Sequence, residues 1–495
     1  MFPFLTALIL LPAVGALALV VLPRAWRARS RHFALAFAVA EFALAAVMVS
    51  QFDATRAGTH QFAEVYPWIP QIGTSWALGI DGIALLMIVL AVTLTPLAML
   101  AAWKEDADPS RQMRYFALIL VLQAFMVGIF AARDVFLFYV LFEAMLVPLY
   151  FLIGTFGGAR RRQAAVSFLL YGLAGGLIML VAVIALYFYG GGGPEAFLTA
   201  NLVGLDIPVV PERLMFIGFF IAFAIKAPMV PLHTWLPDVA EQARPGTTAL
   251  LVAVLDKVGT FGMLTLAIAL FPEAAAWAAP VIIPLAVVSV IYGALAAIGQ
   301  THMMRLVAFT SVSHFGIMVL GIFVFTQTAV EGAAFYMFNH GLSTGALFLL
   351  VGFLVSRRGS ALISDFGGLQ KVTPVFAGLF LIVGLSALAL PGLSPFVSEI
   401  MVLVGGFEVA RVAVIVATAG VVLAAVYVLW AYQRVFHGAT NPELDGTPDL
   451  SLRERLVVAP LIGVMLVLGF VPASAIDLVR EPAATVVSYV AERER

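Results

Sequence analysis

The chain has 495 residues, of which 63% are hydrophobic and only 11% are charged, and its formal net charge is −1. A soluble domain carries roughly 25% charged residues, so a chain this apolar cannot cover itself with polar surface and belongs in a membrane. It contains no cysteine. This excludes disulfides, thiolate-bound zinc, Cys-ligated iron–sulfur clusters and cysteine nucleophiles.

Fourteen apolar runs approach the roughly 20 residues that a membrane-spanning helix needs. They lie near 2–22, 33–51, 79–102, 113–131, 134–157, 164–189, 213–232, 247–271, 277–299, 303–325, 330–355, 374–407, 411–433 and 455–473. The first run has no basic region before it and no cleavage site after it, so we expect it to remain as a span. The sequence therefore predicts an all-α integral membrane protein.

The 27 basic residues are divided very unequally between the two sides of these spans. Eighteen fall in connections on one side, seven fall on the other, and only Lys226 and Lys257 fall inside spans. The positive-inside rule makes the 18-residue side cytoplasmic and places both termini outside. Residues 52–78 then form an aromatic-rich outer connection and 437–454 a cytoplasmic loop. Residues 474–495 are too polar to span.

Two of the predicted spans are interrupted by pairs of prolines. One reads Lys226-Ala-Pro-Met-Val-Pro231, and the other reads Leu390-Pro-Gly-Leu-Ser-Pro395. Proline breaks the helical hydrogen-bond ladder, and freed backbone at membrane depth is tolerated only where protein or a hydrated cavity satisfies it. Paired broken helices indicate inverted repeats around an ion site at the midplane. The alternative is that both are proline kinks that serve packing.

Four of the charged residues that fall within spans are singled out as candidates: Glu143, Lys226, Lys257 and Glu399. Each costs about 2.5–3.5 kcal/mol at the bilayer centre, so the set costs on the order of 10 kcal/mol. The chain has 23 Arg and only four Lys, yet both deep basic residues are Lys. Buried Lys can release its proton and Arg effectively cannot, which favours proton transfer over a fixed counter-ion. Structural ion pairs are the alternative.

Three histidines also lie near span cores or ends: His233, His314 and His340. Each follows or neighbours Ser, Thr, Asn or proline-broken backbone, which favours links in a hydrated relay over hydrogen-bonded packing residues. No spacing typical of a metal site occurs. Asp81 is expected to cap a helix, and Asp256 points about 100° away from Lys257, which leaves its role open.

Five segments together carry a family resemblance: Lys226-Ala-Pro-x-x-Pro-Leu-His-Thr-Trp-Leu-Pro-Asp238, Lys257-Val-Gly259, Ser311-Val-Ser-His-Phe-Gly316, Asn339-His-Gly-Leu-Ser343 and Leu390-Pro-Gly-Leu-Ser-Pro-Phe-x-x-Glu399. They resemble the antiporter-like membrane subunits of bacterial proton-pumping NADH:quinone oxidoreductase, complex I. The resemblance implies one polytopic domain over 1–495 with fourteen spans. Two inverted five-helix repeats, about 113–271 and 277–433, would be flanked by helices within 2–102 and 455–473.

Glu399 makes the chain most similar to the M-type members, since L- and N-type members carry Lys there. By resemblance, Glu143 and Lys226 form the input pair, Lys257 the central relay and Glu399 the exit, with the three histidines in support. The family also commonly has histidine where this chain has Ala240, which puts an input route through that position in doubt.

The resemblance further implies a bacterial cytoplasmic membrane, neighbouring L- and N-type chains, and no cofactor in this chain. Flavin, iron–sulfur clusters and quinone are expected in partner subunits. Two other functions share the same ancestry and motifs: a subunit of a multi-subunit Na⁺/H⁺ antiporter and a subunit of a membrane-bound hydrogenase-type complex.

Overall fold

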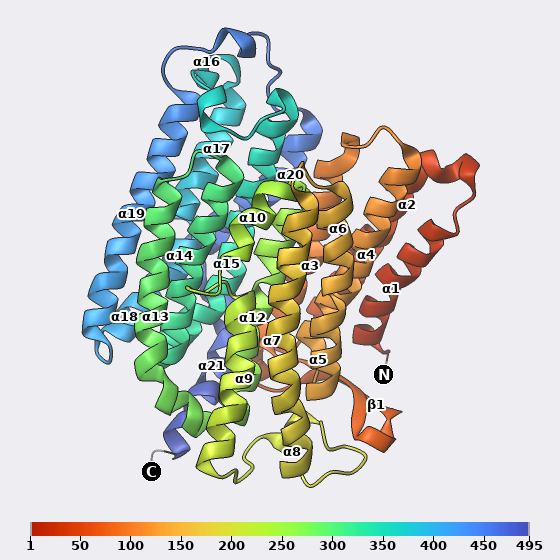
Figure 1. Ribbon diagram of the computed structural model, residues 1–495, viewed down its shortest axis with the longest axis vertical. Helices are drawn as coiled ribbons and strands as arrows, with labels where there is room; N and C mark the ends of the chain where they lie inside the picture. The colour runs from red at the N-terminus through yellow and green to blue at the C-terminus, as the bar shows by residue number, and fades with distance from the viewer. Residues whose placement is uncertain (1, 494–495) are drawn as a thin grey trace.

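Long helices that run between two opposite ends dominate the computed structural model of the chain, which describes residues 2–493 (Figure 1). The N-terminal part contains α1 (Phe4–Val20), η1 (Arg24–Arg29), α2 (Ser30–Gln51), η2 (Ala54–Arg56), β1 (Gln61–Ile69), η3 (Pro70–Ile72), β2 (Thr74–Ile80), α3 (Gly82–Ala101), η4 (Ala102–Lys104), α4 (Pro109–Ala131), α5 (Val135–Ala144) and α6 (Leu146–Phe156). The central part contains α7 (Arg161–Tyr189), α8 (Thr199–Leu202), α9 (Val209–Lys226), α10 (Trp235–Gln242), α11 (Pro245–Leu250), η5 (Leu251–Leu255), α12 (Lys257–Gly262), η6 (Met263–Ile268), α13 (Pro272–Ile298), α14 (Met303–Phe323) and α15 (Gln327–Arg358). The C-terminal part contains η7 (Ile363–Asp365), α16 (Leu369–Val372), α17 (Pro374–Ala387), α18 (Ser394–Phe407), α19 (Arg411–Phe436), η8 (Pro442–Leu444), α20 (Leu452–Phe470) and α21 (Ala473–Arg493). Elements η5 and η6 are π-helical, and the other η elements are 3₁₀ turns.

The helices identify an integral membrane protein. Ten of them within residues 2–493 are long and apolar enough to cross a membrane, and the bent pair of α20 and α21 is an eleventh candidate. Three predicted spans are not among these. Helix α1 has only 17 residues, α9 carries three charged residues, and 374–407 is divided between α17 and α18. The number fourteen therefore stays a prediction.

Both predicted helix breaks are present. Helix α9 ends at Lys226 and α10 begins at Trp235, while α17 ends at Ala387 and α18 begins at Ser394. Proline cannot donate the backbone hydrogen bond that would continue either helix. In the second break, Gly392 has a φ of +96°, a conformation that favours glycine. The two prolines in each run thus set where the helices stop.

The centre of the bundle consists of α14, α15 and the helical segment 245–268, which are almost entirely buried. Helices α2, α13 and α19 bury only one face. Figure 1 shows α1 and α2 at one flank and α18 and α19 at the other. Small residues permit the closest approach: a Cβ at Gly293 of α13 would lie 2.6 Å from the Ser313 nitrogen of α14.

The connections separate by charge between the two ends. At the end that holds α16, which we term the basic end, Arg111 pairs with Asp106 and Arg160 pairs with Glu241. We term the opposite end the hairpin end. There Asp81 caps the start of α3 and accepts a hydrogen bond from the Ala84 nitrogen. The expected capping role of Asp81 is thus confirmed.

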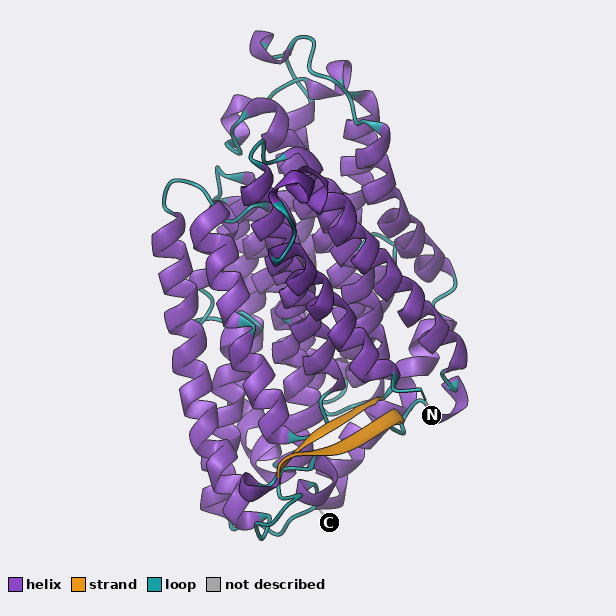
Figure 2. Ribbon diagram, turned by 90° about the vertical axis from the view of Figure 1, so that its right-hand side faces the viewer, coloured by secondary structure: helices purple, strands orange, loops and turns teal. Residues whose placement is uncertain are grey.

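Two elements at the hairpin end differ from the sequence expectations. The outer connection 52–78 contains most of an antiparallel hairpin of β1 and β2 (Figure 2), in which Tyr66 lies opposite Trp76. Its β-branched and aromatic residues fit a pleated sheet. Helix α21 turns by 74° from α20. It packs closely on α3, because a Cβ at Gly82 would overlap the carbonyl of Leu478 in α21. Its buried stripe comprises Ala475, Val479, Ala483, Val486 and Val490, so it covers the bundle as an amphipathic helix.

Candidate functional site

Lys257 lies at the centre of the buried polar residues, between the two π-helical turns η5 and η6. The preceding π turn closes a hydrogen bond from the Asp256 nitrogen to the Leu251 carbonyl, 2.9 Å long and five residues back. The Val252 carbonyl accepts a hydrogen bond from Lys257 Nζ at 2.7 Å. π-helical turns are rare and frequently mark functional sites. Here the irregular backbone supplies the ammonium with an oxygen acceptor inside an apolar helix.

His340 of α15 is the second partner of Lys257. Its Nδ1 lies 2.7 Å from Lys257 Nζ, and its Nε2 lies 3.0 Å from the Thr344 hydroxyl. Both side chains are essentially unexposed. An ammonium only donates, so a charged Lys257 requires an unprotonated Nδ1 and leaves the ring proton on Nε2. The contact is thus able to pass a proton between an amine and an imidazole.

A second histidine and two tyrosines extend this contact toward α18. The ring of His314 lies 5.1 Å from that of His340, and His314 Nε2 lies 3.2 Å from the Tyr427 hydroxyl. Tyr336 contacts both imidazoles and donates its hydroxyl proton to Glu399 Oε2 at 3.0 Å. The structure therefore brings together four predicted site residues: Lys257, His340, His314 and Glu399. The tyrosines were not singled out from the sequence, because nothing there distinguishes them from other buried aromatics.

Lys226 and Glu143 occupy the other side of Lys257. Lys226 Nζ lies 5.2 Å from the ring centroid of Phe142 and 5.1 Å from that of Phe168, a cation–π arrangement. Glu143 interacts electrostatically with Lys226, but the two form no ion pair within 4.0 Å among the described residues. The two residues of the predicted input pair thus lie near each other but are not in direct contact in this structure.

Helix ends hold the two charges beside the breaks. Lys226 is the last residue of α9, where the partial negative charge of a helix C-terminus favours a cation. Glu399 lies in the second turn of α18. Asn339 fixes the N-terminus of α18 by donating to the Ser394 carbonyl at 3.1 Å. The sign of the Lys226 charge therefore matches the end of α9.

The residues from Glu143 and Lys226 through Lys257, His340 and His314 to Glu399 are termed the Lys257 row. Other predicted residues lie outside this row. His233 is buried, packs edge-on against Tyr292, and its Nδ1 has no partner among the described residues. Ala240 is buried on α10. Its neighbour Glu241 is held by Arg160 at 2.6 Å and Arg305 at 3.0 Å at the basic end. Among the described residues, His233 therefore has no hydrogen bond to the residues around Lys257, and Glu241 belongs to surface ion pairs.

A buried carboxyl that the sequence did not single out lies in α2. Glu41 is 1% exposed and accepts a hydrogen bond from Gln123 Nε2 at 2.9 Å, and Gln123 accepts one from Thr95 at 2.5 Å. Glu41 could have been identified from the sequence, because it is an acidic residue inside the predicted span 33–51. It makes no contact with the Lys257 row.

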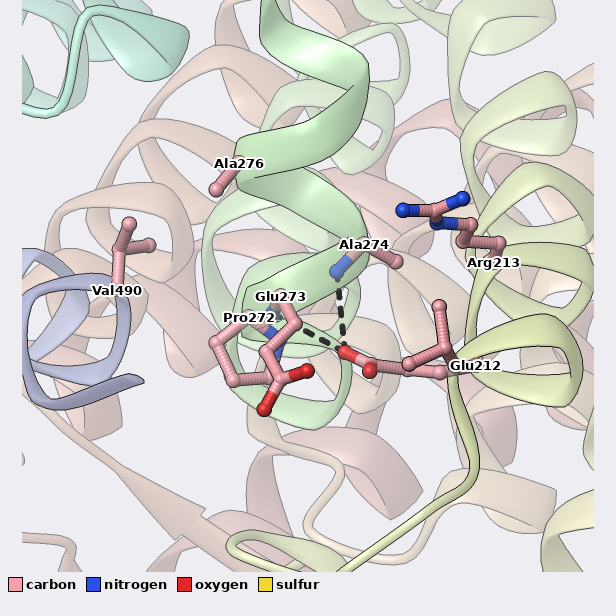
Figure 3. A pocket seen from close by; sticks show the side chains of 8 residues that line it. Glu212, Arg213, Pro272, Glu273, Ala274, Ala276 and Val490 are labelled. Atoms are coloured by element: carbon pink, nitrogen blue, oxygen red, sulfur yellow. Dashed lines mark hydrogen bonds between the residues drawn. The ribbon is translucent and has the colours of Figure 1, made fainter. Parts of the chain in front are cut away.

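Two surface cavities lie at the hairpin end. One of about 270 Å³ lies between α9 and α13, where Glu212 accepts hydrogen bonds from the Glu273 and Ala274 nitrogens at 3.1 Å (Figure 3). Glu212 thereby caps the first turn of α13. Among residues 2–493, no cluster of three or more His, Cys, Asp or Glu fits a metal ion.

A second cavity at this end, of about 320 Å³, is lined by His60, Asp81 and Arg133 among others. Burial and the neighbouring Arg133 guanidinium lower the pKa of His60 to about 4. His60 is therefore neutral at physiological pH. It offers no titrating group that would extend the Lys257 row to this surface.

Gly176→Ala is expected to displace the Glu143 carboxylate, because a Cβ at Gly176 of α7 would overlap Glu143 Oε1. For the input role that the resemblance implies for Glu143, we expect proton translocation to fall by about tenfold, since a proton carrier must stay within reach of its partner. Gly463→Ala in α20 is the matched control, as nothing lies within 4 Å of a Cβ there. Translocation by reconstituted complexes measures both. Equal rates for the two variants would contradict a role for the Glu143 position.

Comparisons with known proteins agree with these features. Residues 132–425 match the family described as NADH:quinone oxidoreductase/Mrp antiporter, TM. The NADH-quinone oxidoreductase subunit M of Mycobacterium tuberculosis strain H37Rv is 43% identical, over 99% of this chain and 95% of its own. Subunit M of Rhodobacter capsulatus is 36% identical, over 98% and 96% of the two chains.

Solved structures show the same fold. A chain of respiratory complex I from Thermus thermophilus with bound NADH superposes with a TM-score of 0.89 at 31% identity, covering 98% of this chain and 99% of that chain. A chain of the Mrp complex from Dietzia sp. DQ12-45-1b shares the fold with a TM-score of 0.82 at 22% identity, covering 99% and 100%. The family match covers more than half of the chain, and the resemblance seen in the sequence is confirmed: the chain belongs to the NADH:quinone oxidoreductase/Mrp antiporter family of membrane subunits.

Proposed function

We propose that the chain is the proton-translocating M-type membrane subunit of a bacterial NADH:quinone oxidoreductase. It would move protons from the cytoplasm to the outside, driven by electron transfer from NADH to quinone in other subunits. The observation that carries the proposal is the buried chain of contacts from Lys257 through His340 and His314 to Tyr427. Titratable groups buried in an apolar bundle are costly, and such groups in contact with one another indicate a functional site.

The proposed roles are those that the family resemblance implies. Glu143 and Lys226 take up a proton in the first half of the chain, Lys257 relays it, and Glu399 releases it in the second half. His340 and His314 connect Lys257 with the tyrosines beside Glu399. A carboxylate that approaches an ammonium to about 4 Å changes its energy by roughly 4 kcal/mol at an effective dielectric near 20. Closing and opening the Glu143–Lys226 gap would therefore load and unload a proton.

The proposed topology has fourteen spans, with inverted repeats over about 113–271 and 277–433. The two broken helices support it, because one ends in a cation and the other begins near an anion. The basic end would face the cytoplasm of a bacterial inner membrane and both termini the outside, as the excess of Arg and Lys favours. His233, within the first break, would support the path on the cytoplasmic side of Lys226.

Neighbouring chains of the L and N type would cover the two flanks where the row reaches the surface. Glu143 is only partly buried. On the opposite flank, Glu399 lines a largely apolar cavity of about 360 Å³ beside Leu390 and Ile400. A partly exposed carboxylate at mid-membrane depth calls for a protein neighbour rather than lipid. Flavin, iron–sulfur clusters and quinone would be held by partner subunits.

Lys226→Ala tests the proposed function. We expect the complex to assemble and proton translocation to be lost, because the only cation at the first break is removed. The measurement is proton uptake by proteoliposomes during NADH oxidation, with Lys104→Ala, an exposed lysine at the basic end, as control. An assembled Lys226→Ala complex that pumps normally would refute the ion-pair mechanism. Sodium-dependent transport without NADH oxidation would instead indicate the antiporter function.

A further inference from the structure

Asp256 is a buried carboxyl that the proposed row does not yet use. It is 0% exposed and lies between the π turn η5 and helix α12. Neither of its carboxylate oxygens has a hydrogen-bond partner among the described residues. Buried polar atoms in native proteins are almost always satisfied, and an unsatisfied one calls for an explanation.

The two adjacent residues Asp256 and Lys257 lie on different faces of α12. Residues three apart share a helix face. Thr260, three residues after Lys257, donates its hydroxyl proton to Met337 Sδ of α15 at 2.9 Å, on the side where Lys257 meets His340. Lys257 therefore faces the second half of the chain.

The Asp256 face is directed at the first helix break. Gly259, three residues after Asp256, packs so tightly on α9 that a Cβ there would lie 2.5 Å from the Phe223 carbonyl and would overlap the Ala227 nitrogen. Phe223 lies three residues before Lys226 in the chain, and Ala227 follows it directly. Asp256 interacts electrostatically with both Lys226 and Lys257. It is thus placed between two lysines that make no direct contact among the described residues.

We propose that Asp256 is a further proton-carrying residue that passes the proton from Lys226 to Lys257. The inference rests on the proposed function. In the first step, the Lys226 ammonium gives a proton to the Asp256 carboxylate, leaving a neutral amine and a carboxylic acid. In the second, the acid gives that proton to neutral Lys257, restoring the carboxylate and forming an ammonium. The flexible stem of Lys257 lets Nζ alternate between Asp256 and His340.

The carboxylate also makes the transfer electrostatically feasible. Two ammonium groups repel one another strongly in a low-dielectric interior. An anion between them compensates the donor before transfer and the acceptor after transfer. An amide of the same shape would keep the packing and supply neither the charge nor an exchangeable acid.

The decisive comparison is Asp256→Asn against Asp256→Glu in the complete complex, reconstituted in proteoliposomes. We expect Asp256→Asn to lower protons translocated per electron by at least about 100-fold, the lower end of the range for a positioned acid–base group, and Asp256→Glu to restore most of it. Glu41→Gln is the matched control. It is an equally buried carboxyl that lies off the row, so it should pump normally.

Infrared difference spectra recorded during turnover give a second readout. A transiently protonated Asp256 should give a carboxylic acid band that is missing in Asp256→Asn and retained in Glu41→Gln. If Asp256→Asn does not assemble, the band position in Asp256→Glu is compared with that of the wild type. A shifted band supports the assignment to Asp256, and an unshifted band overturns the proposal.

A purely structural counter-charge predicts a different pattern. Asp256→Asn would then lower assembly or thermal stability, while each assembled complex pumps as the wild type does, and that result overturns the inference. Loss of pumping in Lys226→Ala together with normal pumping in Asp256→Asn would refute this step alone. Normal pumping in Lys226→Ala would instead refute the function on which it rests.

Discussion

Lys257→Arg is expected to abolish proton translocation while the complex still assembles. Arginine keeps the positive charge but does not release its proton, so only the ability to titrate is removed. A relay that cannot exchange its proton with His340 should slow translocation by at least about 100-fold, the usual contribution of a positioned acid–base group. Proton uptake by proteoliposomes during NADH oxidation measures the effect.

Two further variants separate this explanation from steric damage. Arginine is larger than lysine and the position is fully buried, so Lys257→Met, which is unbranched and apolar, should lose translocation equally. Lys371→Arg, at an exposed position near the basic end, should pump as the wild type does. Full translocation by an assembled Lys257→Arg complex would reduce Lys257 to a structural charge.

Arg357→Ala is expected to cost about 3–5 kcal/mol of stability, the usual penalty for leaving one partner of a buried ion pair alone. Arg357 joins the end of α15 to the start of α20. It forms two hydrogen bonds with Glu454, at 2.7 and 3.0 Å, and three with the carbonyl oxygens of Phe353, Pro448 and Asp449. All five guanidinium donors are therefore used.

The adjacent arginine provides the control for this prediction. Arg358 pairs with Glu443, whose side chain is 64% exposed, and Arg358→Ala should cost no more than about 1 kcal/mol. Thermal unfolding of the solubilised complex and proteolysis within residues 437–451 measure both variants. Arg357→Ala should lower the midpoint and expose the loop. Equal behaviour of the two variants would show that the Arg357–Glu454 pair contributes no more than a surface contact.

The candidate site residues could be singled out from the sequence, whereas the contacts between them could not. Buried Lys and Glu in apolar runs are detectable one at a time, because each stands out against its own neighbours. Contacts such as Tyr336 with Glu399 join helices distant in the chain, and nothing local marks them. The separation of Glu143 from Lys226 is likewise a property of how α5, α7 and α9 pack.

The fold likewise divides into features that the sequence determined and features that tertiary packing decided. Hydropathy, proline pairs and the placement of Arg determined the membrane class, the two helix breaks and the grouping of basic connections at one end, because each depends on composition or on one residue's backbone chemistry. The hairpin of β1 and β2, the bend before α21 and the π turns around Lys257 were decided by tertiary structure. They depend on hydrogen bonds and packing between segments far apart in the chain. The same packing turns Asp256, whose role the sequence left open, toward Lys226.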